Sequence, residues 1–206
     1  MKVILINGSP NAKGCTFTAL REAEDTLQKN GIDTEIVQIG KKPVQGCISC
    51  FSCSNSGKCV FSDIVNELAD KIAEADGVII GSPVYYGNPN GSLMAILARL
   101  FLSAGGRFNG KLAAAVVSAR RGGCSAAFDG INKFFMMCNM HVVSSQYWNQ
   151  VHGFTPEDVK KDQEGLQTMR TLAENMSWLL KCIELGKENG IKPPVHEETV
   201  LTNFIQ

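Results

Sequence analysis

The chain has 206 residues, of which 44% are hydrophobic, so it can bury the core of one ordinary domain and is not a disordered polypeptide. Twenty basic and twenty acidic residues cancel, whereas nucleic-acid-binding proteins show a basic excess, so we expect no nucleic-acid partner. No apolar run approaches the ~18 residues of a membrane span or forms a signal peptide, which predicts a cytoplasmic protein without membrane insertion.

Along the chain, short apolar runs alternate with helical periods. The first run, residues 3–6, is apolar throughout, as is typical of a strand buried on both faces of a parallel sheet. The expected strands cover residues 3–6, 34–39, 77–82, 112–118 and 141–145. The expected helices cover residues 16–30, 63–75 (after a cap at Ser62 or Asp63), 92–103, 126–140 and 155–186. This alternation predicts an α/β fold: a flavodoxin-like, doubly wound, five-stranded parallel sheet with helices on both faces.

The domain organisation is expected to be simple. Residues 1–190 form one domain, interrupted by a cysteine-rich insertion at about 44–61. Residues 191–206 contain Pro193 and Pro194 and have no helical period, which predicts an extended C-terminal tail.

Ligands of doubly wound sheets bind beyond the carboxyl ends of the strands, so the loops there are candidate sites. The loop after the first strand leads straight into a helix, whose free N–H groups suit a phosphate. It is neither a P-loop nor a G-x-G-x-x-G loop. Its hydroxyls and its single lysine, Lys13, favour a monophosphate. The alternative is a plain Gly/Pro turn with helix caps.

Two further loops emerge at the same edge. The loop after the third strand places Tyr85 and Tyr86 between a proline and a glycine, which suits a flat ring; plain surface cover is the alternative. The loop after the fourth strand carries Arg120 and Arg121, which can support negative charge on a bound ring or be ordinary solvated charge. Together the three loops favour a nucleotide-like cofactor with an aromatic ring.

Four of the eight cysteines, Cys47, Cys50, Cys53 and Cys59, have the spacing C-x2-C-x2-C-x5-C. Iron–sulfur clusters need gathered thiolates, and C-x2-C-x2-C supplies three from one tight wrap. Structural zinc sites usually split into two separated C-x2-C pairs, so zinc is the poorer interpretation. Free thiols without metal are the remaining alternative.

Three stretches carry a family resemblance: the N-G-S-P string around Gly8, residues 75–85 and the R-R-G-G string 120–123. They resemble the NADPH-dependent FMN reductase family of flavodoxin-like proteins, over the chain to about Gly186. The resemblance implies that the first loop binds the FMN phosphate, that the second lies along the isoalloxazine and that the third closes over it. The candidate FMN-binding residues are Ser9, Asn11, Lys13, Gly14, Cys15, Thr16, Thr18, Pro83, Val84, Tyr85, Tyr86, Gly87, Asn88, Ser118, Arg120, Gly122 and Gly123.

The cysteine spacing resembles the compact motif of the iron–sulfur flavoproteins, a branch of the same family. The resemblance implies a [4Fe–4S] cluster on Cys47, Cys50, Cys53 and Cys59, although many flavodoxin-like relatives carry cysteines here as a disulfide pair or free thiols. Because these thiols follow an edge strand, we expect them on the side where the flavin loops emerge. There they would lie within reach of the chain's own flavin or of one in a neighbouring subunit.

We therefore predict an FMN-dependent oxidoreductase that passes electrons between a donor and an acceptor, each a small molecule or a protein, with no catalytic acid or base. NAD(P)H is a possible co-substrate. The first alternative is an NAD(P)H-dependent FMN or quinone reductase without a cluster. The second is a non-enzymatic binding module on the same fold. The relatives imply a homodimer or homotetramer.

Overall fold

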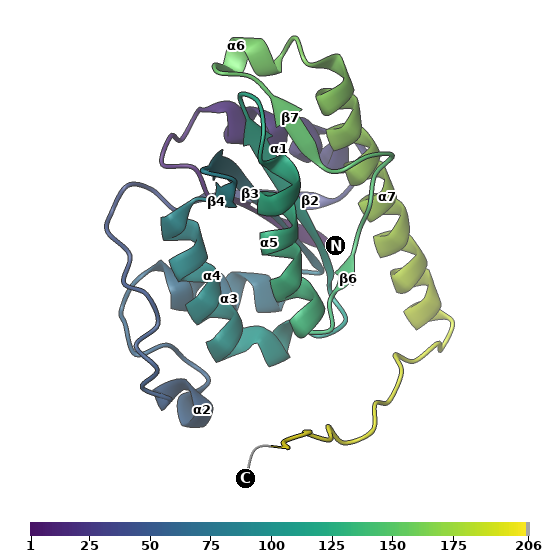
Figure 1. Cartoon of the computed structure of the whole chain (residues 1–206). Helices are drawn as coiled ribbons and strands as arrows, with labels where there is room; N and C mark the ends of the chain where they lie inside the picture. Colours follow the sequence, from purple (N-terminus) through teal and green to yellow (C-terminus); the bar gives the residue numbers. More distant parts are fainter. Residues whose placement is uncertain (205–206) are drawn as a thin grey trace.

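The computed structural model describes residues 1–204 and has a central sheet with helices on both faces (Figure 1). Its strands are β1 (Lys2–Asn7), β2 (Asp33–Gln38), β3 (Gly77–Tyr85), β4 (Asn88–Pro89), β5 (Leu112–Ala119), β6 (His141–Val142) and β7 (Gln150–His152). The main path runs β2-β1-β3-β5-β6 with all pairs parallel. The strand order reverses between β1 and β3, so the loops after these strands open at the switch point of a doubly wound sheet.

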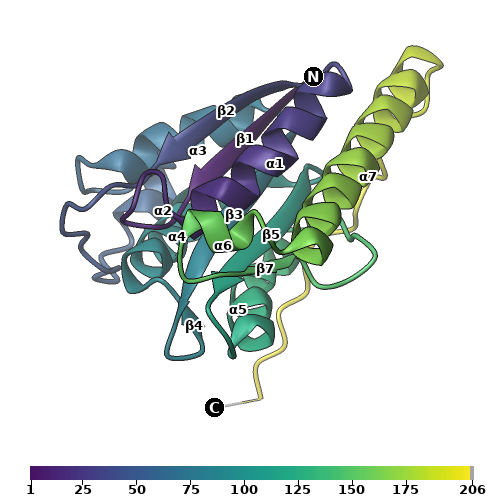
Figure 2. The same ribbon diagram turned by 90° about the horizontal axis from the view of Figure 1, so that it is seen from above.

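The helices form two layers. They are α1 (Cys15–Lys29), α2 (Ser52–Ser56), α3 (Ile64–Glu74), α4 (Gly91–Ala104), the 3-10 helix η1 (Gly105–Phe108), α5 (Cys124–Met137), α6 (Pro156–Val159) and α7 (Gln163–Glu188). Helices α1 and α7 cover one face of the sheet and α3, α4 and α5 the other (Figure 2). In β1, Val3 and Leu5 pack into the first layer and Ile4 and Ile6 into the second, which explains why residues 3–6 are apolar throughout.

The prediction of five strands was wrong in number, because the described chain has seven, although the fold is the expected one. Strand β4 is a short antiparallel return that pairs with β3. The expected strand 141–145 ends at Val142 as β6. Strand β7 then pairs with the later part of β5. Between β6 and β7 the chain turns out of the sheet at Ser145, whose Oγ donates to the carbonyl of Tyr147 at 2.6 Å.

The single helix expected over 155–186 is in fact two helices. The predicted start is right, since Thr155 and Asp158 form a capping box at α6. However, α6 ends after one turn, and a second N-cap, Asp162, begins α7 by accepting from the Gly165 N–H at 2.9 Å. Asp162 also accepts from the backbone N–H of His152 at 2.6 Å, which ties the break to β7.

Two segments lie outside the layers. Residues 39–63 connect β2 to α3 and contain only the five-residue helix α2 (Figure 1). Residues 191–204 have neither helix nor strand, and Figure 1 shows this segment leading away from the end of α7. Among the helices of residues 1–204, none is both long and apolar enough to cross a membrane.

Candidate functional site

The loop between β1 and α1 begins with a glycine that no other residue can replace without movement. The Gly8 N–H donates to the carbonyl of Gly81 at 2.8 Å. A Cβ at Gly8 would lie 2.5 Å from that same oxygen and 2.5 Å from Leu93 Cδ2. The ends of β1 and β3 therefore approach each other closely, and this approach fixes where the loop starts.

The side-chain amides of Asn7 and Gln38 form a hydrogen-bond network that holds the start of the same loop. Asn7 is 0% exposed; its Nδ2 donates to Gln38 Oε1 at 2.5 Å, and its Oδ1 accepts from the Ser9 N–H at 3.2 Å. Gln38 Nε2 in turn donates to the Ser9 carbonyl at 2.5 Å. Gln38 carries no signal in the sequence, because only the pairing of β2 with β1 brings it beside Asn7.

The side-chain hydroxyls predicted to bind the phosphate differ in whether their hydrogen is already used in a hydrogen bond. Ser9 Oγ accepts from the Asn11 N–H at 3.1 Å, so its own hydrogen is free for a phosphate oxygen. Thr16 Oγ1 and Ser118 Oγ lie 2.8 Å apart and only one of them donates to the other, which leaves one further hydrogen. Thr18 donates to the Gly14 carbonyl at 3.1 Å, so its hydrogen is already used.

The N-terminus of α1 has free backbone N–H groups, and the carboxylates of Asp158 and Glu157 lie close enough to act on Cys15 at its first position. Gly14 is the N-cap, no side chain caps the helix, and its first turn contains no acidic residue. Burial raises the pKa of the Cys15 thiol, which keeps this side chain neutral. The positive end of the helix dipole therefore faces no negative charge of the first turn, which suits a phosphate.

The second loop is a tight hairpin. Tyr86 (φ 52°) and Gly87 (φ 76°) are both left-handed between the paired residues Tyr85 and Asn88, as a two-residue type I′ turn requires. Tyr86 is fully exposed and Tyr85 is 44% exposed. The hairpin thus presents aromatic surface at the rim of the sheet.

The third loop packs against this hairpin. Gly123 has φ 92° and N-caps α5, and a Cβ there would lie 2.8 Å from Gly87 Cα and 3.0 Å from Val84 Cγ1. Because Thr16 and Ser118 join the first loop to the end of β5, all three predicted loops meet at one rim. We call residues 7–18, 83–88 and 118–123 the flavin rim, after the cofactor that the family resemblance implies.

Within the flavin rim, the predicted residues divide by exposure. Those that the structure buries or half-buries are Ser9, Gly14, Cys15, Thr16, Thr18, Pro83, Val84, Gly87 and Ser118. Those that it leaves exposed are Asn11, Lys13, Tyr85, Tyr86, Asn88, Arg120, Gly122 and Gly123. The buried set holds the loops together and keeps the free hydroxyl hydrogens of Ser9 and of the Thr16–Ser118 pair, and the exposed set adds side chains at the surface of the rim.

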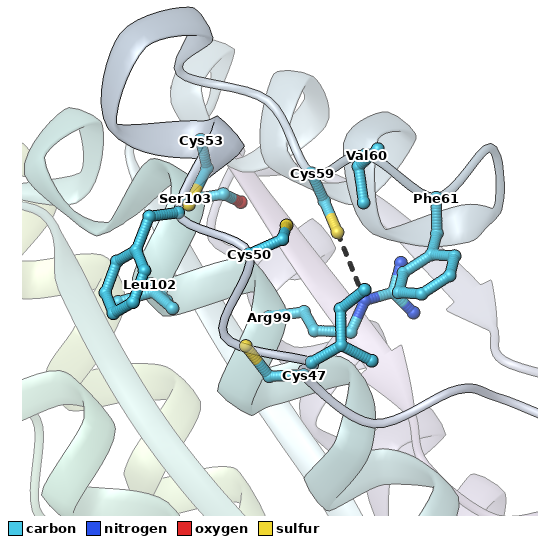
Figure 3. Close-up of a pocket in the computed structure, with 11 residues that line it drawn as sticks. Cys47, Cys50, Cys53, Cys59, Val60, Phe61, Arg99, Leu102 and Ser103 are labelled. Carbon is cyan, nitrogen blue, oxygen red and sulfur yellow. Dashed lines mark hydrogen bonds between the residues drawn. The ribbon is translucent and has the colours of Figure 1, made fainter.

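The four clustered cysteines lie around one pocket, separate from the flavin rim (Figure 3). All four are free thiols; Cys47 and Cys50 are exposed and Cys53 and Cys59 half-buried. Ser49 (φ 52°) and Phe51 (φ 55°) flank Cys50 in the left-handed region, so the backbone wraps tightly at its centre. Hydrogen bonding from the Ser52 backbone lowers the pKa of the Cys50 thiol below its ordinary value.

The four thiols are the type of ligand that an iron–sulfur cluster takes. Four thiols line the pocket without a carboxylate or an imidazole among its lining residues. Over residues 1–204, no three Cys, His, Asp or Glu side chains gather closely enough to hold a single metal ion. A [4Fe–4S] cluster takes one thiolate at each of four irons, so its ligands surround a cube rather than one point.

Arg99 is a residue of this site that the sequence does not single out. It lies on α4 and is 2% exposed, and its Nε donates to Cys59 Sγ at 3.2 Å (Figure 3). Its guanidinium also forms a bidentate pair with Asp63, at 2.7 and 2.9 Å. A lone arginine in an apolar helix gives no sequence signal of this kind, because its partners come from a segment 36 or more positions earlier.

The structure shows where the cysteine pocket lies relative to the flavin rim. The segment does leave the edge strand β2 at the flavin side, but it then runs back along α4 and packs against Arg99, Leu102 and Ser103. Arg99 follows Gly91, the first residue of α4, by eight positions, or about 12 Å along the helix axis. Figure 1 places α2 at the end of α4 away from β4. The thiols are therefore displaced from the chain's own flavin rim.

Comparison with known proteins identifies the class to which this fold and these loops belong. The family described as NADPH-dependent FMN reductase matches residues 1–155. The chain is 36% identical to the iron–sulfur flavoprotein MJ1083 of Methanocaldococcus jannaschii over 192 residues, which cover 89% of this chain and all of that protein. It is 28% identical to the iron–sulfur flavoprotein of Methanosarcina thermophila, over 91% of this chain and all of that protein.

The chain therefore belongs to the NADPH-dependent FMN reductase family, in its iron–sulfur flavoprotein branch. Solved structures agree in fold. An apo NADH:FMN oxidoreductase (EMOB) superposes with a TM-score of 0.65 at 16% identity, covering 86% of this chain and 89% of that one. An archaeal flavodoxin superposes with a TM-score of 0.61 at 16% identity, covering 88% and 99%.

Proposed function

We propose that the protein is an FMN-dependent oxidoreductase that passes electrons between a donor and an acceptor and holds a [4Fe–4S] cluster on Cys47, Cys50, Cys53 and Cys59. The observation that carries the proposal is the presence of two built sites in one chain: three loops meeting at the flavin rim and four thiols around one pocket. Membership of the iron–sulfur flavoprotein branch supports it.

At the flavin rim, the chain's contribution is binding and orientation. The open N-terminus of α1 and the free hydrogen of Ser9 would hold the FMN phosphate, with Lys13 adding charge from the exposed side. Tyr85 and the backbone around Gly87 would lie along the ring, while Arg120 would favour negative charge on it. FMN itself supplies the redox chemistry, exchanging electrons in pairs or singly, so no acid or base of the chain is needed.

The displaced thiols favour electron transfer between chains. Because Arg99, beside the pocket, lies about 12 Å along α4 from Gly91, a second copy covering the pocket could bring another flavin near the thiols. Large apolar residues beside the thiols are exposed, among them Ile48, Phe51 and Leu102. Such a surface beside a cofactor site suits an interface, so we propose a homodimer or homotetramer. The donor and acceptor are small molecules or proteins, and NAD(P)H is a possible co-substrate.

Electron delivery through the cysteine pocket distinguishes this function from that of a cluster-free reductase. Cys50→Ala should lose its iron and keep FMN and the fold, since Cys50 is exposed and outside both core layers. Reduction of the flavin by an iron–sulfur electron-carrier protein should then fall sharply, while reduction by dithionite should persist. Cys182→Ala, which removes an exposed thiol on α7, is the matched control and should behave as wild type.

Three outcomes would count against the proposal. If Cys50→Ala accepts electrons from the carrier protein at the wild-type rate, the cysteine pocket is not on the electron path. An anaerobically reconstituted wild type without iron favours the NAD(P)H-dependent FMN or quinone reductase. A purified protein without flavin leaves the non-enzymatic binding module.

A further inference from the structure

We propose that Arg99 is a positioning residue of the cysteine site: it anchors both ends of the cysteine segment to α4, and its Nε–H makes a cluster bound there easier to reduce. The first part concerns the chain alone. The second part rests on the proposed function, because it needs the cluster to be present.

The anchoring follows from where the donors of Arg99 are directed. Nη1 donates to the carbonyl of Gln45 at 3.0 Å, two residues before the first cysteine of the site. Nε donates to Cys59 Sγ, and the two Nη atoms contact Asp63, four residues beyond that last cysteine. One side chain therefore joins the entry and the exit of a segment that has only one short helix of its own.

The guanidinium is held firmly enough to act as a fixed point. The Arg99 side chain is 1% exposed, so its charge needs a close partner, and Asp63 supplies a bidentate one. The ring of Phe61 lies 4.7 Å from Cζ on top of this pair. A planar group with separate donors in several directions is required here, which arginine offers and lysine does not.

The effect on reduction follows from the sign of the charges. Hydrogen bonds to ligand sulfurs and local net charge set the potential of iron–sulfur clusters. Reduction adds negative charge, so the Nε–H directed at Cys59 Sγ favours the reduced state. The negative charge of Asp63, on the far side of the guanidinium, favours the oxidised state instead. Arg99 and Asp63 are thus two neighbouring residues whose removal should shift the potential with opposite signs.

The anchoring is tested in the metal-free protein by limited trypsin digestion. Lys58 is exposed within the segment, so its cleavage rate reports how firmly the segment is held. Arg99→Gln should raise this rate about tenfold with FMN binding unchanged. Arg107→Gln is the matched control, because Arg107 lies in η1 and pairs with Asp70 at the surface. Equal rates for wild type and Arg99→Gln would overturn the anchoring.

The effect on reduction is tested by anaerobic potentiometry of the reconstituted protein. Arg99→Gln should lower the midpoint potential by about 59 mV, a tenfold change in a one-electron equilibrium. Asp63→Asn, which can still cap α3, should raise it. Mere loosening of the segment would move both variants in the same direction, so equal signs or no shift would overturn this part. Wild type without iron would refute the proposed cluster, while the digestion still decides the anchoring.

Discussion

The flavin rim and the cysteine segment lie at opposite ends of α4 and are built in different ways. The rim is made of strand ends and helix starts, and its polar groups bind one another: Asn7, Ser9 and Thr16 are at most 4% exposed. The cysteine segment, residues 44–61, is mostly exposed and contains one five-residue helix. The buried side chain of Arg99 connects it to α4 at Gln45 and Cys59, and Asn66 of α3 binds the backbone of Cys59 and Phe61.

This difference separates two ways of making a cofactor site. At the rim, the close approach of Gly8 to Gly81 and the amide network of Asn7 and Gln38 are properties of the fold. They are therefore in place before a ligand arrives. In the cysteine segment, few contacts hold the exposed thiols, so the ligand itself must supply much of their order. The rim should thus be sensitive to small changes in packing, and the segment to loss of its ligands.

Removing the rim's hydroxyls should have the largest effect. Replacing Ser9 and Thr16 together with alanine should weaken FMN binding by ~2–4 kcal/mol, at ~1–2 kcal/mol for each hydrogen bond to a charged group. Flavin fluorescence titration measures the affinity. Thr26→Ala is the control, since its hydroxyl binds the Glu22 carbonyl within α1 and lies away from the rim. An unchanged affinity in the double variant would show that the phosphate binds elsewhere.

A matched pair of glycines tests the packing difference between the two regions. A Cβ at Gly8 would lie 2.5 Å from the Gly81 oxygen, whereas a Cβ at Gly46 would meet nothing within 4 Å. Gly8→Ala should therefore lower the free energy of unfolding by about 1–3 kcal/mol, through overpacking. Gly46→Ala should change it by less than about 0.5 kcal/mol. Denaturant unfolding of the two variants in parallel gives both values, and similar losses would contradict the comparison.

Acid should loosen the cysteine segment while leaving the rim intact. Burial alone would raise the pKa of Asp63, but hydrogen bonds from Arg99 and from the Val65 N–H hold this pKa below its ordinary value. A lowered pKa in the folded state stabilises the fold above the unfolded value, and this stabilisation is lost as the pH falls below about 4. The effect should be the smallest of the three, because the carboxylate is one-third exposed.

Hydrogen exchange in the metal-free protein measures this loss. The Val65 amide, which donates to Asp63, should lose protection below about pH 4 after correction for intrinsic rates. The Leu93 amide is the control, since it donates to the non-titrating cap Asn90 at 3.1 Å. In Asp63→Asn the pH dependence at Val65 should disappear. Equal loss at both amides in wild type would instead indicate global unfolding.

Much of the fold could be predicted from local patterns. The continuous apolar run 3–6 gave β1, and the helical periods gave α1, α3, α4 and α5 to within two or three residues. Asp162 was missed as a helix start because a capping box only seven residues earlier already accounted for a single helix. Strand β7 was missed because its three residues pair with β5 only after a turn at Ser145.

The two sites were predictable to different degrees. The loops of the flavin rim could be located because parallel strands open at a common edge. The course of the cysteine segment could not, since its direction depends on the buried contact of Arg99 with Gln45 and Asp63. Nothing in the spacing of the cysteines indicates that the segment turns back along α4. Long-range contacts of a single side chain produce no repeating pattern of residues from which they could be predicted.

The proposed pair of cofactors is tested most directly by the iron, sulfide and FMN content of one anaerobically reconstituted sample, measured together with its absorption spectrum. A chain that holds both cofactors should contain about four irons, about four sulfides and about one FMN. FMN without iron and sulfide would contradict the cluster and leave a flavin reductase. About one zinc for each chain, without sulfide, would assign the four thiols to a structural metal instead.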